Sequence, residues 1–232
     1  MKSAETLIGL VQEIVKDGSF GPSFILSKLN DGLFDVCDLT NPPSLVKHEQ
    51  ELEIYSGEKY VAVPSDFFGS RLFGLYNQTD NIRCEIVYRL ADFVRFSRKY
   101  ANLNEIRSAC LKGRTLHFAG IPEHDTLLFI SYMAEPTVFL SETDSGGDID
   151  YLPPRIGENA IVAYAAKEIY AIIEDGVDGR KMNTEKWESA YALELSKISS
   201  RFGIEAKEAP PEQVEDLAGI SGRGLCIAMG GL

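Results

Sequence analysis

Apolar residues recur at helical spacing near both ends of the chain, and the spacing becomes shorter and strand-like in the middle. The first helical stripe consists of Leu7, Ile8, Val11, Ile14 and Val15. Ser3 is a candidate N-cap for this helix, and Asp17-Gly18 is a candidate stop. A second stripe runs from Ile25 to Cys37, between Gly21-Pro22 and Asn41-Pro42-Pro43. The pattern therefore predicts two N-terminal helices, each with one buried face.

Two further stripes predict a helical hairpin between residues 151 and 203. Pro153 and Pro154 precede the first stripe, and Asp178-Gly179 separates it from the second. The first stripe comprises Ile161, Tyr164, Ala165, Ile169, Ile172 and Ile173, and the second Trp187, Ala190, Tyr191, Glu194, Ile198 and Phe202. Such a short connection favours antiparallel packing, with Trp187 and Tyr191 in the core.

The middle of the chain has the short apolar runs and polar turns that are typical of strands. Two hairpins are predicted, one joining residues 52–55 to 60–63 and one joining 72–76 to 82–88. Three more strands are expected at residues 106–111, 115–118 and 126–133, and a short helix at 89–100. About seven strands are enough for a small sandwich or open barrel.

Together these elements predict an α+β protein in which an antiparallel helical bundle is interrupted by a β-rich insertion. The bundle would comprise residues 1–43 and 151–203, the insertion residues 44–150, and an extended C-terminal tail residues 204–232. The first half of the tail is acidic and contains two prolines, so it cannot form a core of its own. Its end carries an apolar run that we expect to bind a partner, including Leu225, Cys226, Ile227 and Met229.

Charge and composition narrow the possible partners. The formal net charge of −12 argues against general binding to DNA or to anionic membranes, because phosphate contacts need a surface of lysine and arginine. The start MKSAETLIGL lacks the apolar core of a signal peptide, and no apolar run approaches the ~20 residues of a spanning helix, so we expect synthesis in a cytosol. The four cysteines are far apart, which favours reduced, packed thiols.

Candidate chemistry is sparse. The sequence contains no nucleophile-elbow, zinc-protease or phosphate-loop motif, and its three histidines are scattered, so we predict neither an enzyme nor a cofactor. One alternative stays open in the acidic stretch that contains Glu142, Asp144, Asp148 and Asp150. These carboxylates could gather around calcium, or around a divalent metal in a hydrolase or nuclease, although a solvated acidic link is the favoured interpretation.

The densest group of cationic residues lies in the predicted helix at 89–100. Arg89, Arg95, Arg98 and Lys99 interleave there with Phe93, Phe96 and Tyr100. Such a patch can contact an acidic neighbouring subunit or nucleic acid, or it can be a solvated helix face. We favour a subunit contact, because acidic protomers need complementary basic patches in order to associate.

Pro64 and Asp66 mark a second candidate position, where a strand ends. A short acidic side chain at such a turn can accept backbone N–H bonds, so Asp66 is expected to hold the junction between the bundle and the insertion.

Several segments, taken in order, resemble the head-to-tail adaptor proteins of tailed bacteriophages over residues 1–203. The most characteristic pieces are Val63-Pro64-Ser65-Asp66-Phe67 and the strand, proline turn and long strand of Leu116 to Pro136. The other matching segments are FILSKLNDGLFDVCDL, IGENAIVAYAAKEIYAIIED and KWESAYALELSKISSRFG.

This resemblance implies a structural virion protein in the neck, made in the host cytoplasm, that forms a dodecameric ring beneath the portal. The implied partners are the portal protein, neighbouring copies of the chain and tail or nozzle proteins, with DNA only as a passenger in the lumen. The residues themselves predict no membrane, metal or cofactor. A tail-completion or terminator ring lower in the tail shares the same assembly logic and is the main alternative.

Overall fold

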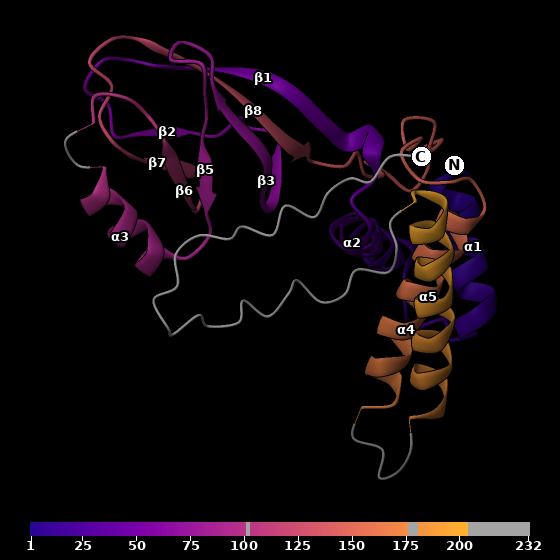
Figure 1. Ribbon diagram of the computed structural model, residues 1–232. Helices are drawn as coiled ribbons and strands as arrows, with labels where there is room; N and C mark the ends of the chain where they lie inside the picture. Colours follow the sequence, from indigo (N-terminus) through magenta and orange to yellow (C-terminus); the bar gives the residue numbers. More distant parts are fainter. Residues whose placement is uncertain (101–102, 176–180, 204–232) are drawn as a thin grey trace.

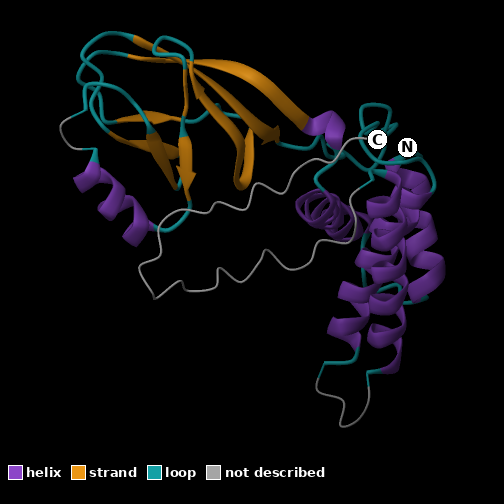
Figure 2. Cartoon of the chain, viewed as in Figure 1, coloured by secondary structure: helices purple, strands orange, loops and turns teal. Residues whose placement is uncertain are grey.

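The computed structural model describes residues 1–100, 103–175 and 181–203. In Figures 1 and 2, helices α1, α4 and α5 stand together at one end of the molecule, and the strands and helix α3 form the other end. Each end has its own cluster of buried apolar side chains, so the described chain has a helical unit and a β unit.

The N-terminal helices form as their capping residues predict. Helix α1 is Ala4–Val15, and the Ser3 side chain accepts a bond from the backbone N–H of Thr6. Helix α2 is Pro22–Thr40, with Pro22 in its first turn. It ends where Asn41 adopts a left-handed conformation and donates its N–H to the Cys37 carbonyl at 2.8 Å.

Helix α4, Ile156–Ile173, is the central helix of the helical unit, and the other three helices of the unit pack around it. It is buried on most of its circumference and packs against α1, α2 and α5, the last being Met182–Arg201. Its inner face is rich in small residues, namely Ala160, Ala163, Ala165 and Ala166. Small residues let three helices approach the same central helix closely.

The predicted antiparallel helical bundle is therefore wrong, although the α+β composition holds. Figure 1 shows α2 end-on while α1, α4 and α5 are seen along their lengths, so α2 crosses the other three. A Cβ added to Gly32 of α2 would lie 3.1 Å from the Tyr164 ring of α4. Apolar periodicity identifies a buried face but does not fix the crossing angle, which this close contact helps to determine.

Two four-stranded sheets dominate the central part of the chain. The first has the order β1-β8-β3-β4 and is antiparallel throughout, and the second has the order β2-β7-β6-β5, with β5 and β6 parallel. The strands are β1 Val46–Ile54, β2 Tyr60–Ala62, β3 Phe67–Asn77, β4 Ile82–Arg83, β5 Glu85–Val87, β6 Ser108–Lys112, β7 Thr115–Ala119 and β8 Thr126–Ala134.

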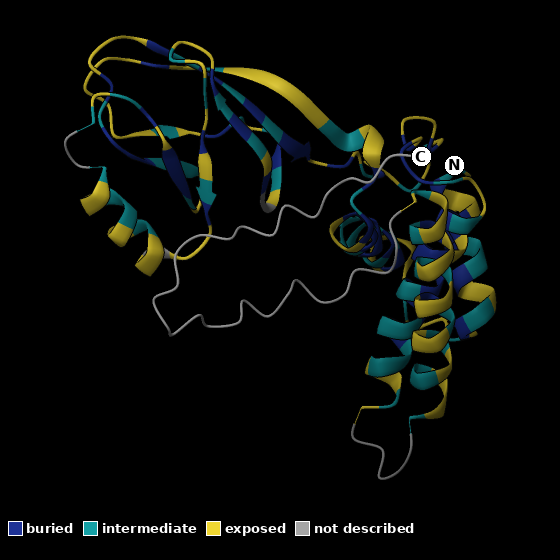
Figure 3. Cartoon of the chain, in the orientation of Figure 1, coloured by how far each residue is buried: buried dark blue, intermediate teal, exposed yellow. Residues whose placement is uncertain are grey.

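The first predicted hairpin is wrong, because β1 pairs with β8 and β2 pairs with β7, in different sheets. The second is correct only for its first residues, where β3 pairs with β4 before the chain crosses to β5 in the other sheet. The three later strands form as predicted, and β6 and β7 are joined by a turn at Gly113, whose φ is 61°. Buried side chains of β3, β6, β7 and β8 make up most of the β core. Figure 3 colours the ribbon by how far each residue is buried.

Candidate functional site

Helix α3, Leu90–Lys99, carries the predicted cationic patch and lies against the second sheet, beside β5, β6 and β7. Phe93, Phe96 and Ser97 are half-buried on the side turned towards the sheet. Phe93 and Ser97 also line a cavity of about 330 Å³ with Lys59 and His117. The helix thus contacts the β unit through the side that carries Phe93 and Ser97.

The cationic side of α3 faces solvent. Arg95, Arg98 and Lys99 are exposed on the helix, and Arg89 is exposed at its N-cap. Lys99 Nζ lies 4.9 Å from the centre of the Tyr100 ring, a cation–π contact that orients this side chain. Within the part of the chain that the structure describes, none of the three arginines forms an ion pair. The patch therefore presents guanidinium groups that are free to bind an external carboxylate.

Asp66 lies where the strands of the first sheet meet the helical unit. Its Oδ2 lies 2.5 Å from Lys47 Nζ, its Oδ1 accepts a bond from the Tyr132 hydroxyl at 2.8 Å, and its carbonyl accepts one from Glu135 N–H. The Lys47 bond holds the pKa of Asp66 below its usual value, and burial together with Asp66 raises the pKa of Tyr132 to about 12. The other residues that donate to the Asp66 carboxylate thus do so through side chains on β1 and β8, not through the turn N–H groups that we expected.

Pro64 contributes to this junction through its carbonyl. That oxygen accepts the Phe67 N–H at 3.1 Å, closing a turn, and the Arg114 guanidinium at 3.1 Å. Arg114 follows Gly113 in the β6–β7 turn, so the second sheet is tied to the beginning of β3.

The two phenylalanines after Asp66 join the two cores, a feature that we did not predict. Phe67 is 4% exposed in the β core, with its ring centre 5.8 Å from that of Tyr132. Phe68 packs on the helical core, where its ring stacks on Phe34 of α2 at 5.7 Å. Neighbouring strand residues point to opposite sides, so one dipeptide anchors both units. The signal in the sequence is the pair of aromatic residues directly after a turn.

The acidic stretch is an ordered loop that holds the N-terminus. The Asp144 carboxylate accepts the N–H groups of Leu140 and Gly146, which lower its pKa, and the Asp144 carbonyl accepts the N–H of Ala4 at 2.8 Å. Ile149 is buried in the helical core. Within residues 1–100, 103–175 and 181–203, no group of three or more histidine, cysteine or acidic residues is arranged to hold a metal ion. The metal hypothesis thus has no geometric support in the described loop.

Three predicted thiols are buried and free: Cys37, Cys84 and Cys110. Burial raises the pKa of the Cys37 and Cys84 thiols to about 12, which keeps both protonated at neutral pH. The packed-thiol prediction is confirmed for these three. The fourth cysteine, Cys226, and the other tail residues Leu225, Ile227 and Met229 lie outside the described residues.

A second surface that we did not predict is a cavity of about 360 Å³ between α1 and α5, with α4 at its base. It is lined by Leu10, Glu13, Ile14, Glu158, Asn159, Val162, Ala163, Trp187, Ala190 and Glu194. Trp187, which we expected in the core, is half-buried along this groove, whereas Tyr191 is buried and donates its hydroxyl to Asp35. The groove combines apolar walls with three carboxylates.

No family model matches the chain, and no curated protein matches it. Across the described parts of the protein, no helix is both long enough and apolar enough to cross a membrane.

Proposed function

We propose that this protein is a structural component of a tailed-phage virion, a head-to-tail adaptor that forms a ring beneath the portal. Such a ring joins the capsid vertex to the tail and leaves a central passage for DNA. The proposal begins from the order of segments shared with that family. The observation that carries it is the exposed cationic face of α3, which lacks ion pairs within the described residues while the chain as a whole is strongly acidic.

The net charge of the chain and the position of its cationic patch favour a contact between subunits over binding to nucleic acid. Two copies with a net charge of −12 repel each other unless a local cationic patch on one meets carboxylates on the other. Arg89, Arg95, Arg98 and Lys99 provide such a patch. A nucleic acid held by these four cations would be repelled by the net negative charge of the chain, whereas DNA passing through a lumen benefits from walls that do not hold it.

The test is assembly of the purified full-length chain, alone and with purified portal rings from the same phage. Sedimentation velocity and negative-stain electron microscopy should show closed rings of uniform size that attach to the portal. The Arg95→Glu/Arg98→Glu variant should lose rings, whereas Arg83→Glu/Lys112→Glu, with the same charge change at two exposed β-unit positions, should keep them.

A chain that stays monomeric at all concentrations, with and without portal rings, would refute the proposal. Rings that bind purified tail tubes and ignore the portal would instead indicate a tail-completion protein.

A further inference from the structure

The groove between α1 and α5 has carboxylates that are not fully satisfied within the protomer. Glu194 is only 12% exposed at its side chain, and its Oε1 is bonded to Lys197 at 2.6 Å. Its Oε2 is covered and has no hydrogen-bond donor among the described residues. A carboxylate oxygen without a donor is costly in a covered position, so this groove favours an incoming cation.

The other two carboxylates, Glu158 and Glu13, differ in the hydrogen bonds and ion pairs that they already form. Glu158 is buried and accepts the Lys2 backbone N–H at 2.8 Å, with Lys2 Nζ at 3.4 Å. Glu13 is exposed at the rim, and no ion pair within the described chain involves it. Glu13 on α1 therefore has no ion-pair partner within the described chain, and Glu194 on α5 keeps one carboxylate oxygen without a donor, on two sides of an apolar floor that contains Val162 and Ala163.

Helix α3 has the complementary pattern on its solvent face. Ala91, Val94, Arg95 and Arg98 lie on one stripe, and Val94 is 46% exposed although it is apolar. The stripe from 91 to 98 is ~10 Å long at 1.5 Å per residue, the same length as the α5 wall from Trp187 to Glu194. The stripe thus combines an exposed apolar residue with two guanidinium groups that follow it, and it complements a groove that combines an apolar floor with carboxylates.

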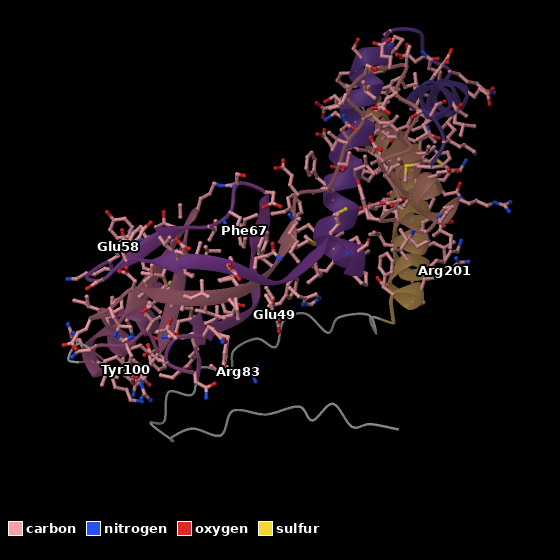
Figure 4. All side chains as sticks on the ribbon, turned by 90° about the horizontal axis from the view of Figure 1, so that it is seen from above. Glu49, Glu58, Phe67, Arg83, Tyr100 and Arg201 are labelled. Atoms are coloured by element: carbon pink, nitrogen blue, oxygen red, sulfur yellow. The ribbon has the colours of Figure 1, made fainter. Side chains whose placement is uncertain are left out.

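The α3 that fills a groove must come from another copy of the chain. Figure 1 places α3 at the far end of the β unit, and Figure 4 shows Tyr100, next to the end of α3, far from Arg201 at the end of α5. The chain's own tail is a poorer occupant, because residues 204–232 contain five acidic and two basic residues.

We infer that the groove formed by α1, α4 and α5 receives helix α3 of a neighbouring copy, with Arg95 and Arg98 paired to Glu13 and Glu194. The contact joins two different surfaces, so it is head-to-tail, the type that closes into rings or continues as filaments. This inference rests on the proposed ring function and adds to it the acceptor surface.

A charge-swap experiment tests the contact in the full chain. Arg95→Glu/Arg98→Glu makes α3 acidic, and Glu13→Arg/Glu194→Arg makes the groove basic, so each variant alone should assemble at least ten-fold more weakly in sedimentation velocity. When the two variants are mixed one to one, the acidic α3 of the first can bind the basic groove of the second. The unchanged basic α3 of the second can bind the unchanged acidic groove of the first, so assembly should return with alternating subunits.

The controls reverse equal charge elsewhere. Arg83→Glu/Lys112→Glu and Glu51→Arg/Glu53→Arg alter exposed positions outside both surfaces and should leave assembly unchanged without any pairwise rescue. Because Glu194 is nearly covered, circular dichroism should confirm that its variant is folded. The single change Glu13→Arg, at an exposed site, provides the same test with no risk to the core.

The outcomes separate this inference from the proposed function. If the unmodified chain assembles and attaches to portal rings while the reversed variants also assemble, or the mixture does not recover, the α3–groove contact is wrong and the ring function stands. If the unmodified chain never assembles, the α3–groove contact and the proposed ring function are both wrong.

Discussion

Replacing Phe68 by alanine should weaken the helical unit and leave the β unit nearly unchanged. Its ring stacks on Phe34 of α2, whereas that of the preceding residue, Phe67, is packed in the β core. Phe67→Ala is the matched control, because it removes the same atoms one residue away and should weaken the other unit.

The expected magnitudes follow from the burial of the two rings. Phe67 is 4% exposed, so its loss should cost about 3–5 kcal/mol of β-unit stability. Phe68 is half-buried, so roughly half of that, about 2 kcal/mol, is expected from its packing and its aromatic contact.

The sequence provides a selective probe for this experiment. Trp187 is the single tryptophan and belongs to the helical unit, so its fluorescence during denaturation reports that unit. Hydrogen exchange of peptides from β6 to β8 reports the β unit. Phe68→Ala should lower the fluorescence midpoint and spare the exchange protection, and Phe67→Ala should do the reverse. Equal shifts of both probes in both variants would show that the two cores unfold as one, which would refute the assignment of one phenylalanine to each.

Four further predictions concern single positions and the tail. Burial alone would raise the pKa of Glu174, but hydrogen bonds from Thr184 and Asn183 at the start of α5 lower this pKa to about 2. The ionised Glu174 therefore stabilises the fold above pH ~4.5, and this stabilisation is lost as the pH falls towards 2. Glu174→Gln should make the melting temperature less dependent on pH over that range. Gly146→Ala should cost about 1–3 kcal/mol in chemical denaturation, because Gly146 has a φ of +68° and a Cβ there would lie 2.5 Å from the Lys2 carbonyl oxygen; a neutral result would mean that the loop moves freely. Asp66→Ala should cost about 1 kcal/mol in thermal melts, allowing for solvent screening of the Lys47 pair, without abolishing assembly, and an unchanged melting temperature would contradict its junction role. Removing residues 205–232 should leave a folded protomer that attaches poorly to portal rings in a pull-down, whereas unchanged attachment would make the tail a passive extension.

Local signals in the sequence predicted the elements better than their arrangement. Ser3, Pro22 and Asn41 marked helix ends correctly, because capping and proline geometry act over a few residues. Strand pairing did not follow from proximity in sequence. The chain from β1 enters β2 after a short turn, yet β1 completes the first sheet beside β8 and β2 completes the second beside β7. Whether such a turn closes a hairpin or passes between sheets depends on distant strands.

The two candidate surfaces also differ in whether neighbouring residues or distant segments of the chain form them. The cationic face of α3 was visible because its residues lie within ten positions of one helix. The groove was not, since its walls come from α1 and α5 and its floor from α4, and the spacing of Glu13, Glu158 and Glu194 carries no shared pattern. Their proximity depends on α4 being the central helix, which is also why the bundle prediction failed.

The junction between the units bears directly on whether the proposed contact closes into a ring. In a head-to-tail assembly the angle between successive copies is set by the geometry of donor and acceptor within one protomer, and small variations accumulate around the ring. Here the donor α3 belongs to the β unit and the acceptor groove to the helical unit. The angle between successive copies therefore depends on how firmly the Asp66-Phe67-Phe68 segment holds the two units together. A firm junction gives one angle and one ring size, whereas a loose one allows open or mixed assemblies. Phe68→Ala replaces no residue of either contact surface, so it is expected to change the uniformity of rings seen by electron microscopy more than the strength of each contact.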